Sequence, residues 1–74
     1  MTETAISIRE SIAQRIRSRR EDHGWTQLDL ASRSGLSLSA ITKYESGSAA
    51  PMIDSIIKLS IVLGCTPNDL LGFN

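Results

Sequence analysis

The stretch TQLDLASRSGLSLSAITKYESG, residues 26–47, limits the possible folds of this chain more than any other segment does. It contains two short helical patterns that are joined by a Ser-Gly-Leu turn. A small residue, Ala31, is followed by Gly35 four positions later, and then by the apolar residues Ile41 and Tyr44. A small side chain lets two helices cross closely, and a glycine tolerates the left-handed backbone of a tight turn. The spacing predicts a helix-turn-helix whose second helix is anchored from one side only.

Capping residues and glycines divide the rest of the chain into further helices, and no strand pattern is present. Thr26, Ser37 and Thr66 are suited to helix N-caps, and Gly64 is suited to a helix end. We therefore predict five helices, at about residues 7–22, 26–34, 37–45, 52–63 and 66–72.

The length of 74 residues allows one domain with a single core. The predicted fold class is all-α, a compact five-helix domain over residues 1–74. Its core covers about residues 7–72, and a short N-terminal tail occupies residues 1–6. We expect two apolar stripes in the core. One contains Ile8, Ile12 and Ile16, and the other contains Ile53, Ile56, Ile57, Leu59, Ser60 and Leu63.

Charge and cysteine usage exclude several classes of protein. The net charge is zero, which counts against a strongly basic, non-specific nucleic-acid binder. Residues 9–43 are nevertheless locally positive, which fits either a binding surface or an ordinary solvated helix face. A single cysteine, Cys65, and a single histidine, His23, predict no disulfide, no metal site and a cytoplasmic location. No apolar run approaches the roughly 20 residues of a membrane span.

The motifs WTQLDLASRSGLS, AITKYESG, IKLSIVLG and TPNDLL, in this order, resemble the lambda-repressor and Cro type (XRE-like) of helix-turn-helix domain. The resemblance covers about residues 7–72. It implies that the predicted helix at 37–45 enters the DNA major groove. The implied base contacts are Leu38, Ser39, Thr42 and Lys43. Leu38 could instead pack under the neighbouring turn, and Lys43 could be an ordinary solvated lysine.

The resemblance also implies contacts with the DNA backbone. Gln27 stands where relatives bind a phosphate, and Thr26 and Ser37 could add donors while they cap their helices. The further candidates for phosphate contact are Arg17, Arg19 and Arg33. Relatives often carry basic residues in the loop SGSAAP, which is uncharged here, so we expect a shallow salt dependence.

The resemblance also implies a salt bridge within the domain and an interface between two copies. Arg20 and Glu45 match a partly buried salt bridge that joins the first helix to the third. Members usually dimerise on inverted repeats, and we assign Ile61, Leu70 and Phe73 to a two-fold interface. Alternatively, Phe73 folds back onto its own domain.

These observations predict a sequence-specific regulator of double-stranded DNA, a dimeric repressor that acts without a cofactor. The protein is expected to be bacterial or phage-encoded, and to be cytoplasmic and associated with the nucleoid. An enzyme is not expected, because no cluster of nucleophile, base and oxyanion donor is present. One alternative is an antitoxin-like module that binds an unidentified protein. Another is a degenerate domain that has lost DNA binding. The operator, the regulated genes and the sign of regulation do not follow from the sequence.

Overall fold

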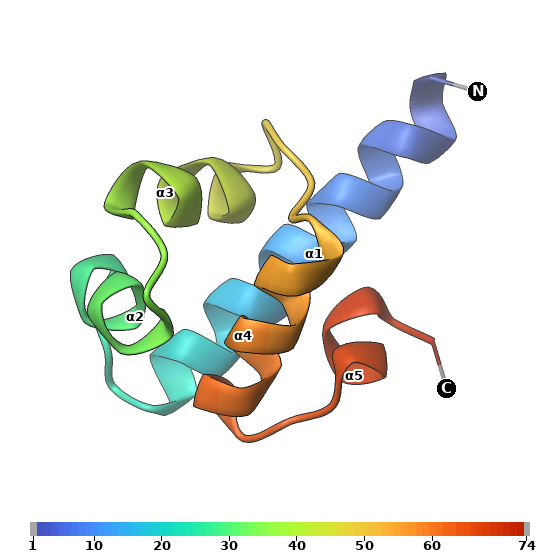
Figure 1. The fold of residues 1–74 in the computed structure, drawn as a ribbon. Helices are drawn as coiled ribbons and strands as arrows, with labels where there is room; N and C mark the ends of the chain where they lie inside the picture. Colours follow the sequence, from blue (N-terminus) through green and yellow to red (C-terminus); the bar gives the residue numbers. More distant parts are fainter. Residues whose placement is uncertain (1, 74) are drawn as a thin grey trace.

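The long helix α1 (Thr2–Asp22) is the element on which the others are assembled in the computed structural model (Figure 1). The structure describes the backbone of residues 2–73 and the side chains of residues 8–73. The remaining helices are α2 (Gln27–Ser34), α3 (Leu38–Ser46), α4 (Ile53–Leu63) and α5 (Pro67–Leu71). α1 packs against α3, α4 and α5, and α2 packs against α3 and α4. No strand occurs between residues 2 and 73, and the all-α, five-helix prediction is confirmed.

Each helix contributes one large, fully buried side chain to a common core. These side chains are Ile16, Leu30, Ile41, Leu59 and Leu70. Burying a side chain of this size stabilises the fold by roughly 1.5–3 kcal/mol. All five helices are therefore held by the same cluster. Within the described residues, no helix combines the length and apolar character that crossing a membrane requires.

Helix α1 begins earlier than predicted. It starts at Thr2, so that residues 2–6, which were expected to form a tail, are helical. Neither glycine nor proline occurs before Gly24, so nothing in this segment stops the helix. The start at residue 7 was inferred from the first apolar residue of the stripe. That residue, Ile8, is itself 53% exposed and lies outside the core.

The apolar stripe predicted for α4 is narrower than expected. Ile56, Leu59 and Leu63 are buried, as predicted, but Ile53 is 78% exposed and Ile57 is 46% exposed. The prediction was wrong for these two residues because the helices that pack against α4, which are α1, α2 and α5, leave much of both side chains uncovered. The arc of isoleucines is wider than the surface that the neighbouring helices cover.

Two capping boxes fix the starts of α2 and α5. Thr26 Oγ1 accepts a hydrogen bond from Asp29 N (3.1 Å), and Asp29 Oδ2 accepts one from Thr26 N (2.9 Å). Thr66 and Asp69 repeat this arrangement with the same distances. The hydrogen bond from the backbone N–H of the threonine lowers the pKa of each aspartate. The backbone C-cap of α2 is Gly35, which has a φ of 75° and so occupies the predicted left-handed turn.

Acid should remove the stabilisation that these boxes provide. Folding lowers the pKa of Asp29 and Asp69, so at low pH the unfolded chain binds more protons than the folded chain does. The contribution is therefore present above the ordinary aspartate pKa of about 3.9 and is lost as the pH falls below it. The double variant Asp29→Asn, Asp69→Asn should be less stable than the wild type at pH 7, and the difference should shrink towards about pH 2. Urea unfolding at both pH values measures it. If the difference in free energy of unfolding between wild type and variant were the same at both pH values, this account would be wrong.

Candidate nucleic-acid interface

Helix α3 is anchored along one side and exposed along the other. Ile41 is fully buried and Glu45 is 3% exposed, and both face the body of the domain. The four predicted base-contact residues are all exposed, and they are Leu38, Ser39, Thr42 and Lys43. Ser39 and Lys43 lie on the side of the helix opposite Ile41. Leu38 is 45% exposed at the first position of α3, so its side chain reaches solvent. In Figure 1, α3 forms the outer edge of the molecule, far from α5.

The hydroxyl groups of Thr26 and Ser37 serve as helix caps. Thr26 Oγ1 accepts from Asp29 N, and Ser37 Oγ accepts from Ala40 N at 3.0 Å. Each hydroxyl keeps its own proton, since it accepts in the cap. Capping and donation to an anion are therefore compatible at both residues.

A buried ion pair joins α1 to the last turn of α3. Arg20 Nε donates to Glu45 Oε2 at 2.7 Å, and Arg20 Nη2 donates to Glu45 Oε1 at 2.9 Å. The two side chains are 11% and 2% exposed. The hydrogen bond to Glu45 raises the pKa of Arg20, which keeps the guanidinium charged. Arg20 Nη1 also donates to Trp25 O at 2.6 Å, so that the pair reaches the start of α2 as well.

Gln27 extends this pair towards the exposed face of α3. Its Nε2 donates to Glu45 Oε1 at 3.1 Å, and its Oε1 accepts from Thr42 Oγ1 at 3.2 Å. The residue was predicted as a phosphate ligand, and its contact with α3 was missed. Fifteen positions separate Gln27 from Thr42, and no local sequence pattern indicates the contact. The second N–H of the amide is still able to donate to a phosphate.

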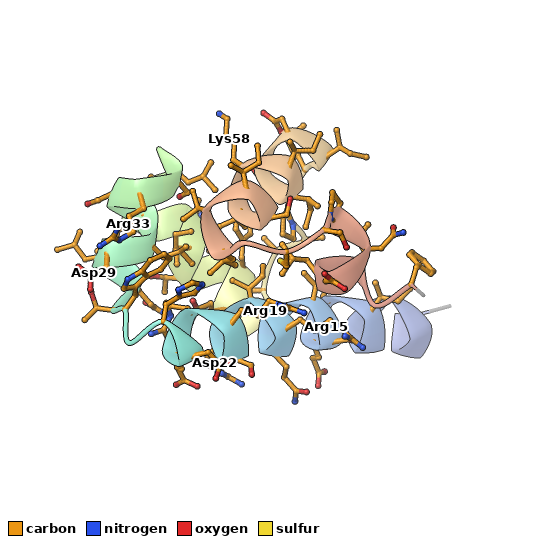
Figure 2. All side chains as sticks on the ribbon, turned by 90° about the horizontal axis from the view of Figure 1, so that it is seen from below. Arg15, Arg19, Asp22, Asp29, Arg33 and Lys58 are labelled. Atoms are coloured by element: carbon orange, nitrogen blue, oxygen red, sulfur yellow. The ribbon has the colours of Figure 1, made fainter. Side chains whose placement is uncertain are left out.

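The three arginines predicted to bind phosphate lie in different places. Arg17 lines a groove between α1 and the end of α3, together with Glu10 and Gly47. The guanidinium of Arg33 lies 4.4 Å from the centre of the Trp25 ring. Arg19 lies beside Arg15 on α1, as Figure 2 shows, with its Nη2 4.0 Å from an Asp69 carboxylate oxygen of α5. Arg19 therefore lies next to α5 and apart from the other predicted DNA contacts.

The predicted two-fold interface needs one correction. Leu70 is fully buried in the core of its own domain, so it presents no surface to a second copy. Ile61 and Phe73 are 74% and 69% exposed, and Phe73 does not fold back into the core. Ile57 and Ile53 lie one and two turns before Ile61 on the same face of α4. Their spacing of four residues was visible in the sequence, but it was assigned to the core.

The sequence matches the family model for a helix-turn-helix over residues 16–70. The chain belongs to the helix-turn-helix family. It is 31% identical over 61 residues to the cryptic phage CTXphi transcriptional repressor RstR of Vibrio cholerae. That match covers 82% of this chain and 54% of RstR, so the chain spans about half the length of this relative.

Two solved structures share the fold of this helix-turn-helix protein. One is the restriction-modification controller protein C.AhdI from Aeromonas hydrophila, with a TM-score of 0.80, 32% identity, and coverage of 84% of this chain and 94% of that chain. The other is the P22 c2 repressor in complex with a synthetic operator, with a TM-score of 0.79, 32% identity, and coverage of 85% and 96%. The predicted lambda-repressor-like fold is confirmed, and both family and fold are those of DNA-binding transcriptional regulators.

Removing the charge of Glu45 should destabilise the domain strongly. Glu45→Gln leaves the Arg20 guanidinium largely buried without a carboxylate, and breaking such a pair costs about 3–5 kcal/mol. Urea unfolding, followed by the fluorescence of the single tryptophan, Trp25, measures the change. The matched control is Glu21→Gln, at an exposed glutamate of α1. If Glu45→Gln lowers the free energy of unfolding no more than the control does, the ion pair does not hold α3.

Proposed function

We propose that this chain is a homodimer that binds double-stranded DNA sequence-specifically, on an inverted-repeat operator, and represses transcription by blocking promoter access. The observation that carries the proposal is the position of α3. The helix is held by Ile41 and Glu45 on one side, and its other side is free to enter a major groove. A P22 c2 repressor of similar fold was solved on an operator, and the relative RstR is a transcriptional repressor. The place of action is then the bacterial cytoplasm, at the nucleoid.

The exposed face of α3 carries the proposed base contacts. Lys43 can donate to O6 and N7 of guanine, which is one of the commonest specific contacts in the major groove. Ser39 can pair with several bases, and Leu38 can pack against a thymine methyl group. The exposure of these three residues supports this assignment.

Backbone contacts at the starts of α2 and α3 position the helix on the duplex. Thr26, Gln27 and Ser37 supply N–H and hydroxyl donors at two helix N-termini, where the dipole also favours a phosphate. Arg17 and Arg33 stay in the proposed phosphate set. Arg19 is left out, because it lies beside Asp69 of α5.

The exposed isoleucines of α4 supply a self-complementary surface for the dimer. Ile53, Ile57 and Ile61 form one apolar stripe, and a two-fold axis would pair this stripe with its own copy. Asp54 and Lys58 flank the stripe. In an antiparallel pair of α4 helices, each Asp54 would approach Lys58 of the second copy.

Selection from random duplex DNA at physiological salt should enrich an inverted repeat. In the variant Lys43→Ala, preference should relax at one position of each half-site, at a cost of about 1–3 kcal/mol. The matched control is Arg19→Ala, which removes a cation of α1 that lies beside Asp69 of α5 and outside the proposed DNA contacts. The control should leave the base preference unchanged.

Two results would contradict this proposal. Weak, salt-sensitive binding without any enriched sequence would favour the antitoxin-like alternative, in which the domain binds another protein. An equal loss of affinity on every sequence for Lys43→Ala would remove this residue from base recognition.

The dimer should dissociate when the α4 stripe is charged. Ile61→Asp replaces an isoleucine whose burial in the interface stabilises the dimer by roughly 1.5–3 kcal/mol. Both copies carry the substitution, so this loss occurs twice in a two-fold dimer. The dimer Kd should therefore rise by at least roughly 100-fold. Sedimentation over a dilution series measures it, and Leu28→Asp, at a 60% exposed leucine of α2, is the control. An unchanged oligomeric state for Ile61→Asp would exclude this interface.

A further inference from the structure

A chain of hydrogen bonds leads from the buried ion pair to the exposed face of α3. It starts at Arg20, whose guanidinium is always protonated and can only donate. Glu45 lies against it with its side chain 2% exposed, and both of its carboxyl oxygens accept from the guanidinium. The direction of every later hydrogen bond follows from this first pair.

The second step fixes the orientation of the Gln27 amide. The oxygen and nitrogen of an amide look alike in outline, so their assignment has to come from their partners. Glu45 Oε1 only accepts, so the Gln27 atom 3.1 Å away from it is the nitrogen. The amide oxygen of Gln27 then points at Thr42, at 3.2 Å.

The third step fixes the polarity of the Thr42 hydroxyl. This group has one proton and lies near two oxygens that only accept, Gln27 Oε1 at 3.2 Å and Leu38 O at 2.9 Å. The proton is engaged by one of these two oxygens, so it is directed into the protein. Thr42 is an exposed residue, and with its proton engaged its hydroxyl oxygen can only accept from a group that approaches α3 from outside.

We propose that Thr42 is a specificity-determining residue that only accepts a hydrogen bond from DNA, and that it selects adenine or cytosine at the base it faces. In the major groove, adenine N6 and cytosine N4 donate, whereas guanine O6 and thymine O4 accept. A guanine or thymine at this place would put two acceptors together and leave both unpaired, which is costly when water is excluded. This inference rests on the proposed function.

Lys43, the next residue, has the opposite polarity. Its ammonium group only donates, so it suits guanine O6 and N7 or thymine O4. The exposed face of α3 thus places an acceptor, Thr42, beside a donor, Lys43. The pair distinguishes the two orientations of a base pair, because each base pair has its amino group on one strand and its keto group on the other.

The test compares DNA selections for the wild type, Thr42→Val and Thr42→Ser. Valine keeps the shape of threonine and removes the hydroxyl, whereas serine keeps the hydroxyl. We expect the wild type and the serine variant to enrich adenine or cytosine at one position per half-site, and the valine variant to lose this preference. Loss of one good base contact corresponds to roughly a 5- to 150-fold loss of affinity. The fluorescence of Trp25 checks that each variant folds.

A second measurement deletes the amino group from the DNA. The enriched adenine is replaced by purine, or the enriched cytosine by 2-pyrimidinone, in an otherwise unchanged operator. The wild type should lose affinity on the altered operator, and Thr42→Val should bind both operators equally. This comparison isolates the contact from any effect of the substitution on folding.

Three outcomes would overturn the inference, and they are distinguishable from one another. Guanine or thymine at the Thr42-dependent position would mean that the hydroxyl donates to DNA. An unchanged preference in Thr42→Val would mean that the residue reads no base, while sequence-specific binding itself would stand. If the wild type enriches no sequence at all, the proposed function fails, and the inference fails with it.

Discussion

The ion pair between Arg20 and Glu45 is the interaction on which the exposed face of α3 depends. Ile41 buries apolar surface under the helix, but hydrophobic contact is non-directional and leaves the helix able to rotate or slide. The bidentate pair fixes the last turn of α3 to α1 through directional hydrogen bonds. A buried pair recovers little net free energy, because both charges lose their water. Its contribution here is therefore geometric, because it fixes the orientation of the exposed face of α3.

The starts of α2, α3 and α5 could be predicted from the sequence because they are set by local chemistry. Thr26, Ser37 and Thr66 cap the helices that follow them, and Gly35 adopts the left-handed turn that its position requires. Each of these signals acts within a few residues of where it occurs. The start of α1 has no such signal, and it was placed five residues too late.

The wrong predictions concern contacts between helices. Ile53 and Leu70 are both apolar residues at helical spacing, yet Ile53 is 78% exposed and Leu70 is fully buried. Periodicity identifies the face of a helix to which a residue belongs, but not whether another helix covers that face. Arg19 was placed with the DNA contacts for the same reason, since its position beside Asp69 depends on where α5 packs. The contact of Gln27 with Thr42 likewise follows only from the crossing of α2 and α3.

The balance of charges suggests how such a domain could discriminate between DNA sequences. The net charge is zero and residues 46–51 carry no charge, so few phosphates are neutralised and non-specific affinity should be low. Useful specificity is the ratio of specific to non-specific binding, and a weak background raises that ratio. In the proposed complex, discrimination then comes from the direction of hydrogen bonds on α3. That direction is set inside the protein, because Arg20 donates to Glu45, Glu45 orients Gln27, and Gln27 faces Thr42.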